Sequence, residues 1–382
     1  MAKKRANGEG NIRKRKDGRW EGRYTAGHDP ATGKRIVKNV LGKTQGEVRK
    51  KLVQAIEDSR QLDVTRDDYT VAEWLRLWFE LYSQPNIRTS TANRYEHMIE
   101  NYAIPRIGSI KLLKLTARDL QQLYKDLLTS GRMRLGKSGN PGLSPSTVHS
   151  LHMMLHAAFK QAMKERLILR NPTEDCVSPK PCKTEMKILH PDSIGAYLKA
   201  AERHHSLPMF YLELITGLRK GEITALRWDD VDVENKTVSV NKQLVRNPDG
   251  SLELTRPKTE TSIREISIPQ DAVDLLIQEH ELHPDSPYLF PSSTTGEMYH
   301  PDSVVKLHKR ILRDAGLPHI RFHDLRHTFA TLALQNGIDI KTVSTMLGHY
   351  DAGFTLKTYT HATRQGQEAA AQILGSFMSQ MV

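Results

Sequence analysis

The sequence predicts a multidomain α+β protein: a small N-terminal three-stranded sheet plus helix, an all-α helical domain, and a mainly α domain with a small antiparallel sheet. Three observations predict this. A chain of 382 residues is too long for one typical hydrophobic core. Strand-like alternation changes to helical spacing near Thr70, and a proline-rich stretch without periodicity precedes the last part. We therefore expect domains at residues 1–62, 66–171 and 189–382, with a linker at 172–188.

The first 62 residues are basic and alternate in the manner of short strands. Residues 1–60 hold 17 Lys and Arg against 7 Asp and Glu, which is +10 of the chain's net +12. Lys16–Arg19 is a hairpin turn signal, and Thr44 begins a helix that runs to about Ser59. The charge favours a polyanionic partner, nucleic acid before anionic membrane, over a solvated charged sheet. The candidate DNA-binding side chains here are Arg13, Lys14, Arg15, Lys16, Arg19 and Arg23.

The middle part has the apolar spacing of amphipathic helices. We predict helices from Ser90 to Tyr102, from Thr116 to Thr129, and from Ser144, with Pro145 at the first helical position, to Lys164. The loop before the last of these is rich in glycine and basic residues, a composition that suits either contact with phosphates or an idle solvated loop. Its candidate DNA-binding side chains are Arg132, Arg134 and Lys137.

The last part begins with two predicted helices and then changes to strands. A helix opens at Pro191, and a second runs from about Leu207 to Thr216, where Gly217 ends it. Alternation predicts strands at 231–233, 237–245 and 262–268, with a strong turn at 247–250. Helices resume near Asp271, Pro301, Asp324 and Asp339.

Composition also narrows the class of protein. The only cysteines, Cys176 and Cys182, lack the spacing of a zinc site and give no disulfide framework, which suits a reducing compartment. No apolar run approaches the roughly 20 residues that span a bilayer, and the start lacks a signal peptide's apolar region. We expect a cytoplasmic protein with no membrane partner. The absence of P-loop and HExxH motifs predicts no cofactor and no metal.

Four short motifs in the last part place cations, imidazoles and a phenol in a fixed order. They are Thr216–Glu222 around Arg219, Arg321–His327 around His323 and Arg326, Leu347–His349, and Thr358–His361 around Tyr359. The planar fork of arginine matches two phosphate oxygens, and histidine adds a donor that also moves a proton. Taken singly, each motif is also compatible with a solvated basic helix end.

In this order, with a lysine between the first two, the motifs resemble those of the tyrosine recombinases, the phage and mobile-element integrase family. The resemblance covers the whole chain. It implies an arm-type DNA-binding domain, a helical SAM-like core-binding domain and a catalytic domain. It further implies site-specific recombination of double-stranded DNA at core and arm sites, without metal or ATP, to integrate and excise a phage or mobile element. An accessory DNA-bending or excision factor is a further expected partner.

Cutting a phosphodiester without metal requires cations for the phosphate oxygens and an acid for the leaving alkoxide. The resemblance implies that Arg219 and Arg326 hold the phosphate. It also implies that the histidines of the second and third motifs, His323 and His349, contact the same group. Lys258, in a polar turn between the first two motifs, is the preferred acid, and Lys242 is the second choice.

The nucleophile of such a reaction attacks phosphorus and forms a 3′-phosphotyrosine. Tyr359 is preferred over Tyr350 because its surroundings, with Thr355, Thr358 and a histidine two positions on, resemble those of the family's nucleophile. Glu222 lies one turn after Arg219, so it either orients that guanidinium, helps to position a histidine, or forms a plain helix salt bridge.

The tail, residues 362–382, gathers apolar residues on one helix face: Ala370, Ile373, Leu374, Phe377 and Met378. This face packs either on its own domain or, as the resemblance implies, on a neighbouring protomer in a homo-tetramer on DNA. Two other functions remain open. A type IB topoisomerase-like enzyme would relax single duplexes, and a catalytically silent DNA-binding regulator would form no covalent adduct.

Overall fold

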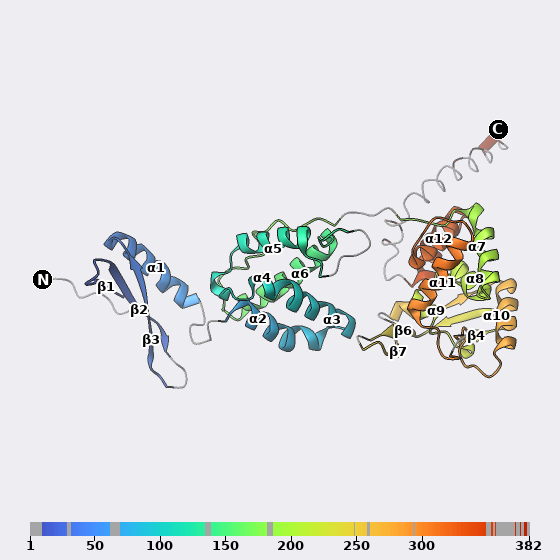
Figure 1. Cartoon of the computed structure of the whole chain (residues 1–382), viewed down its shortest axis with the longest axis horizontal. Coiled ribbons are helices and arrows are strands. Elements are labelled where there is room, and N and C mark those ends of the chain that lie inside the picture. The colour runs from blue at the N-terminus through green and yellow to red at the C-terminus, as the bar shows by residue number, and fades with distance from the viewer. Residues whose placement is uncertain are drawn as a thin grey trace. The chain divides into compact units, whose positions relative to one another are not determined.

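The computed structural model describes residues 10–28, 32–61, 69–133, 139–181, 186–247, 249–257, 260–292 and 295–348, with residues 353, 356, 371, 375, 378 and 379 of the C-terminal region. The chain divides into two units, Met1–Lys183 and Thr184–Val382. Figure 1 labels their helices and strands. Among the described residues, no helix is both long enough and apolar enough to cross a membrane.

The N-terminal part of the first unit is the predicted three-stranded sheet and helix. Strands β1 (Asn11–Lys14), β2 (Trp20–His28) and β3 (Arg35–Gly42) pair antiparallel in that order, and α1 (Gln45–Gln61) packs on one face. Gly22 lets the helix approach, because a Cβ there would lie 3.0 Å from Val48 Cγ1. Val48 and Leu52 are buried on the helix side, whereas the aromatic side chains of β2 are only half-buried.

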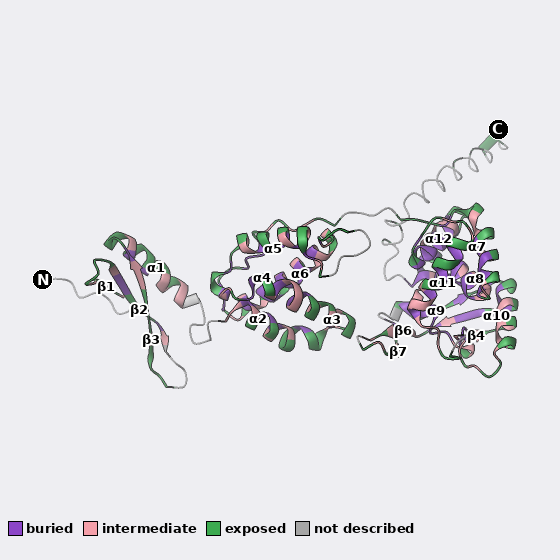
Figure 2. Ribbon diagram, in the orientation of Figure 1, coloured by how far each residue is buried: buried purple, intermediate pink, exposed green. Residues whose placement is uncertain are grey.

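The rest of the first unit is all-helical and encloses a continuous apolar core (Figure 2). Trp74 and Tyr124 are fully buried, and Trp74 Nε1 donates to the Ala158 carbonyl at 3.1 Å. Thr70 and Thr116 each begin a helix with a reciprocal capping box. The helices are α2 (Val71–Trp78), α3 (Thr89–Met98), α4 (Ile104–Ile107), α5 (Ala117–Ser130) and α6 (Pro145–Lys164).

Two helices of this part continue as π-helical turns, η1 (Phe79–Ser83) after α2 and η3 (Ile99–Ala103) after α3. Short 3₁₀ segments follow as η2 (Gln84–Asn86) and η4 (Leu112–Lys114). The helix predicted from Ser90 to Tyr102 therefore exists, but its second half has the wider π geometry.

The second unit combines seven helices with five short strands within the described residues. The helices are α7 (Pro191–Arg203), α8 (Leu207–Thr216), α9 (Lys220–Ile223), α10 (Gln270–Leu282), α11 (Pro301–Asp314), α12 (Phe322–Gln335) and α13 (Ile340–Leu347). Strands β4 (Val231–Asp232), β5 (Thr237–Val240) and β8 (Arg264–Ser267) form one antiparallel sheet, and β6 (Gln243–Arg246) pairs with β7 (Leu252–Thr255). The predicted fold class is confirmed.

The strand predicted at residues 237–245 is in fact two strands in different sheets. The chain leaves the first sheet at Asn241 and Lys242, whose side chains both contact the buried Asp230 carboxylate. This side-chain interaction replaces the ladder at that point. The second hairpin, with β7, was not among the predicted strands.

Gly217 determines how α8 meets α12 and α13. It has the left-handed conformation (φ 61°, ψ 36°) that glycine adopts at helix C-termini. A Cβ at this position would lie 2.5 Å from the Phe329 ring and 2.9 Å from Leu347 Cδ2. The end of α8 therefore packs directly against both later helices, and the residues that follow Gly217 enter the candidate site.

Candidate active site

The start of α12 fixes where His323 and Arg326 lie. Arg321 precedes the helix, and its backbone N–H donates to Asp324 Oδ2 at 2.7 Å, so Asp324 closes a capping box. Asp324 is buried, which anchors the first turn. His323 is consequently at the second helical position and exposed, and Arg326 is almost one turn further on and faces the interior.

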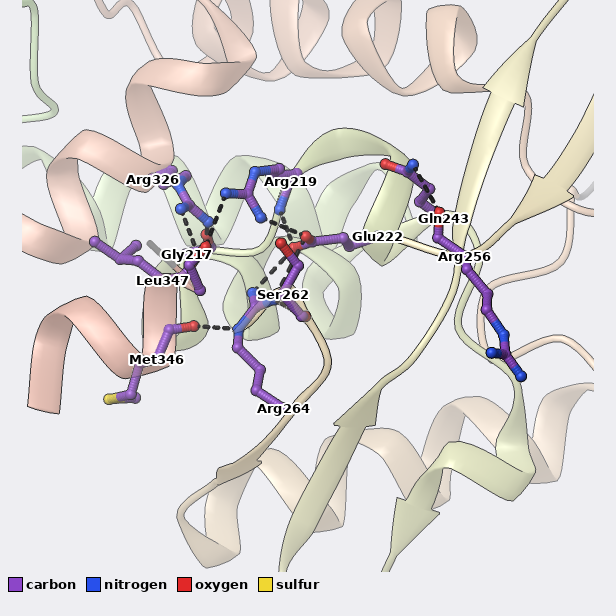
Figure 3. Close-up of polar contacts among 11 residues, drawn as sticks. Gly217, Arg219, Glu222, Gln243, Arg256, Ser262, Arg264, Arg326, Met346 and Leu347 are labelled. Atoms are coloured by element: carbon purple, nitrogen blue, oxygen red, sulfur yellow. Dashed lines mark hydrogen bonds and ion pairs between the residues drawn. The ribbon is translucent and has the colours of Figure 1, made fainter. Parts of the chain in front are cut away.

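Arg326 is almost completely buried, with 2% of its surface exposed. Its Nη1 donates to the Gly217 carbonyl at 2.7 Å and its Nη2 to the Leu347 carbonyl at 2.5 Å. Burial, followed by the nearby charge of Arg219, lowers the pKa of Arg326 to about 9, so the side chain stays charged at neutral pH. The arginine thus links the end of α8 to the end of α13 (Figure 3).

Arg219 immediately precedes α9 and is held by Glu222. The Arg219 backbone N–H donates to Glu222 Oε2 at 2.9 Å, and its Nη1 lies 2.7 Å from Glu222 Oε1. Its Nη2 donates to the Gly348 carbonyl at 3.2 Å. Glu222 is 2% exposed, so a buried carboxylate both caps the helix and orients the guanidinium. This contact is compatible with two of the three expectations for Glu222, an orienting role and a plain helix salt bridge.

A third arginine, Arg264 on β8, also binds Glu222 and was missed in the sequence. Its Nη2 lies 3.0 Å from Glu222 Oε2, its Nη1 donates to the Ser262 carbonyl at 2.9 Å, and its Nε donates to the Met346 carbonyl at 2.5 Å. Burial by itself raises the pKa of Glu222, but the charge of Arg264, followed by that of Arg219, outweighs it, so the pKa is lowered.

A signal for Arg264 was present in the sequence. Side chains alternate between the two faces of a strand, so Arg264 shares a face with Ile266 and Ile268 in the predicted strand 262–268. All three side chains are buried. An arginine on the core face of a strand needs buried partners. The pattern therefore indicates a buried ion pair, although not its identity.

His323 faces a pocket of about 500 Å³ beside Arg219. Its lining is mixed. Basic side chains contribute Arg219, Lys220, Lys309, Arg321 and His323, and apolar side chains contribute Val305, Ile320 and Phe322. Desolvation of the ring by its surroundings lowers the pKa of His323 to about 4, and the charges of His327 and Arg326 act in the same direction. The residue as a whole is nevertheless exposed. His323 is therefore neutral at neutral pH in this structure.

Behind the arginines lies Glu213 of α8, which is 0% exposed. Neither of its carboxyl oxygens has a hydrogen-bond partner. Burial raises the pKa of Glu213 well above its ordinary value, against the opposing charge of Arg326. We infer a neutral carboxyl group in the core beneath the candidate site.

Three of the expected site residues, Lys258, His349 and Tyr359, lie outside the described residues, as does the competing Tyr350. The second-choice lysine is described. Lys242 Nζ lies 2.5 Å from Asp230 Oδ1, a carboxylate that is 4% exposed. Among the described residues, no group of three or more His, Cys, Asp or Glu side chains is arranged to hold a metal ion.

The N-terminal sheet forms a second candidate site, on the face opposite α1. Glu21 of β2 is 1% exposed and lies 2.7 Å from Arg13 Nε and 3.3 Å from Arg23 Nε. Hydrogen bonds from Asn39 and Arg13 lower the pKa of Glu21 to about 2. The turn repeats this pairing, because Arg15 and Arg19 both lie near Asp17. Lys14 and Lys16 are exposed.

In the helical part, Arg132 has a local role. Its Nε donates to the Gly142 carbonyl at 2.9 Å, and its backbone N–H donates to the Pro141 carbonyl at 2.8 Å. Arg132 thus joins the two ends of the glycine-rich loop. The other two expected side chains, Arg134 and Lys137, lie outside the described residues.

Known families and structures match this fold. A model described as the Phage integrase family matches residues 186–365, and one described as Phage integrase, N-terminal SAM-like domain matches residues 70–128. A tyrosine recombinase XerC-like protein of Caldanaerobacter subterraneus subsp. tengcongensis is 27% identical over 92% of this chain and 94% of its own length.

Two solved structures have the same fold. The integrase of transposon Tn1549, in complex with a circular intermediate DNA, superposes with a TM-score of 0.66 at 20% identity, over 79% of this chain and 99% of that one. A lambda integrase tetramer bound to a Holliday junction gives a TM-score of 0.54 at 18% identity, over 90% of this chain and 96% of that one. The chain belongs to the tyrosine recombinase family, whose members include the integrases of phages and mobile elements.

Proposed function

We propose that the chain is a site-specific DNA recombinase that cuts and rejoins double-stranded DNA through a 3′-phosphotyrosine, and that it integrates and excises a phage or mobile element. The observation that carries the proposal is the meeting of Arg219, Arg326 and Glu222 at the end of α13, beside a pocket that His323 lines. Arg219 and Glu222 come from one segment of the chain and His323 and Arg326 from another, and the two segments are far apart in sequence.

In the proposed reaction, Arg219 and Arg326 hold the non-bridging oxygens of the scissile phosphate. A guanidinium forms two charge-assisted bonds to such a group, and loss of one preorganised donor typically costs about 2.7 to 4 kcal/mol of transition-state stabilisation. Glu222 sets the orientation of Arg219 before DNA arrives. The cations provide the charge stabilisation, so the proposed reaction uses neither metal nor ATP.

The covalent step exchanges one phosphodiester bond for another. The Tyr359 oxygen attacks phosphorus, and the bond from phosphorus to the 5′ oxygen breaks. The phenol proton passes to His323, which has a pKa of about 4 in the empty site and gains basicity from the bound phosphate. Lys258 gives a proton to the leaving 5′ oxygen, and His349 contacts the phosphate. Lys258 is preferred because Lys242 already binds the buried Asp230.

DNA is also the proposed partner of the basic N-terminal sheet and of the glycine-rich loop. The proposed contacts are Arg13, Lys14, Arg15, Lys16, Arg19 and Arg23 at arm sites and Arg132, Arg134 and Lys137 near the core site. By analogy with the lambda integrase tetramer, we propose a homo-tetramer on DNA that is joined through the tail, residues 362–382. An accessory DNA-bending or excision factor is a further proposed partner.

The test measures whether the chain forms a covalent adduct with DNA. A library of nicked duplexes with a randomised centre is offered to the wild-type chain, and the sequences that it cuts are recovered. Cleavage by the wild type in the presence of chelator should leave protein on the 3′ end and a free 5′ hydroxyl. This hydroxyl should then accept a kinase label in a separate step. Tyr359→Phe removes only the attacking oxygen and should bind these duplexes but form no adduct, whereas Tyr350→Phe should react. Adduct from Tyr359→Phe, or a strict need for a divalent ion, would contradict the proposal.

A further inference from the structure

Three successive carbonyl groups, those of the last two residues of α13 and of its C-cap Gly348, are each bound by a different arginine. Met346 O accepts from Arg264 Nε, Leu347 O from Arg326 Nη2, and Gly348 O from Arg219 Nη2. The carbonyls of a final helical turn have no partner within the helix and carry the negative end of its dipole. Three cations from three separate elements therefore use one helix end as their common acceptor (Figure 3).

The three arginines differ in what else they are free to bind. The Arg219 side chain is 36% exposed and borders the pocket beside His323, so it has room to meet a phosphate. The Arg264 side chain is 4% exposed, and all three of its nitrogens have protein acceptors. Arg264 therefore belongs to the scaffold and does not itself reach a ligand in the pocket.

Arg264 also touches three other segments near the site: α9, the turn before β8, and the end of α13. It binds Glu222, which holds Arg219, and the Ser262 carbonyl, in the 3₁₀ turn η6 (Glu260–Ser262) that closely follows Lys258 in sequence. Gly348 packs on its guanidinium, because a Cβ there would lie 3.0 Å from Nη1 at a backbone φ of 61°. The residue after Gly348 is His349.

We propose that Arg264 is a positioning residue that fixes the end of α13 against the Arg219–Glu222 pair, and so sets the place from which the chain continues to His349. The inference rests on the proposed recombinase function. Without Arg264, Glu222 keeps only Arg219 as a charged partner, and the Met346 carbonyl loses its donor. The Gly348 carbonyl, which accepts from Arg219 Nη2, is then no longer held in place. A displacement of about 1 Å at such a site costs about 100-fold in rate.

The test uses the full chain and a nicked duplex that the wild type has been shown to cut. If the proposed function is wrong, the wild type forms no adduct, and this result is distinguished from failure of the positioning role. Arg264→Met keeps the length of the side chain without its donors and should form adduct about 100-fold more slowly, with nearly unchanged affinity for the duplex. Arg264→Lys keeps one donor and should recover part of the rate. Ile266→Ala, on the same face of β8 but in the apolar core, controls for lost stability and should cut at the wild-type rate where it is folded.

Two further measurements separate positioning from general loss of stability. Glu222→Gln combined with Arg264→Met should cut little more slowly than either single variant, because both act through the same contact, whereas Ile266→Ala should combine additively with either. Hydrogen exchange of the α13 amides should increase in Arg264→Met and not in Ile266→Ala. Wild-type adduct rates in Arg264→Met, or strict additivity with Glu222→Gln, would overturn the inference.

Discussion

Replacing Glu213 with glutamine should change how stability depends on pH. The carboxyl group is fully buried, has no hydrogen-bond partner, and has a pKa well above its ordinary value of 4.5. Below pH 4.5 the folded and unfolded chains both hold the proton. Above it the unfolded chain releases the proton and the folded chain keeps it. Stability from this group is therefore present at acid pH and lost as pH rises, by about 1.4 kcal/mol per pH unit until the folded carboxyl ionises.

Glutamine has the same shape but does not titrate, so the difference in free energy of unfolding between Glu213→Gln and wild type isolates this effect. The difference should rise with pH in favour of the variant, with a slope of at most about 1.4 kcal/mol per unit, for as long as the folded carboxyl keeps its proton. Urea unfolding from pH 5 to pH 8, followed by protease susceptibility of the second unit, measures it. Glu202→Gln, at an exposed position of α7, controls for loss of a carboxylate.

A flat difference across this pH range would refute the reasoning. It would mean that Glu213 is ionised in the folded protein and that the positive charge of Arg326 outweighs the cost of burial, the opposite of the balance described above.

Two predictions concern the ends of the chain. Residues 1–60 on their own should bind duplex DNA, and neutralisation of about five phosphates gives a slope of log K against log salt of about −4.5. Deleting these residues should impair integration and spare cleavage at the core site. Equal loss of integration and cleavage would contradict a separate binding role. Truncation after Thr363 should weaken assembly of several protomers on DNA and preserve single-site binding, as native gels would show; unchanged assembly would mean that the tail packs only on its own domain.

Local signals in the sequence were sufficient to predict most of the helices. Ser144 with Pro145 begins α6 and Gly217 ends α8, because the energetics of a helix end involve only a few neighbouring residues. The π-helical turn η3 was not predictable in this way, since an extra residue per turn is tolerated only where packing with other helices favours it. The break after β5 was not predictable from local signals either, because Asn241 there contacts the buried Asp230, eleven residues earlier in the chain.

For the candidate site, the sequence indicated the types of residue and their order along the chain. It did not indicate that their side chains lie close together in the fold. Arg326 binds carbonyls that lie 109 and 21 positions away in the chain, and no periodicity relates such distances. The expectation that Arg219 and Arg326 meet came from resemblance to a family. Arg264 was missed because its role depends on three long-range partners, although its place on the core face of a strand was visible.

The buried Glu21 affects how the charge of the N-terminal sheet acts over time. Arg13 and Arg23 already lie within 3.3 Å of this carboxylate, so an arriving phosphate must compete with it for the same donors. In the proposed binding to arm sites, we therefore expect random duplex DNA to gain less from the sheet than its number of arginines suggests, and each encounter to be brief. A protein that must find a few sites in a whole genome benefits from such brief encounters, because long residence on wrong sequences slows the search.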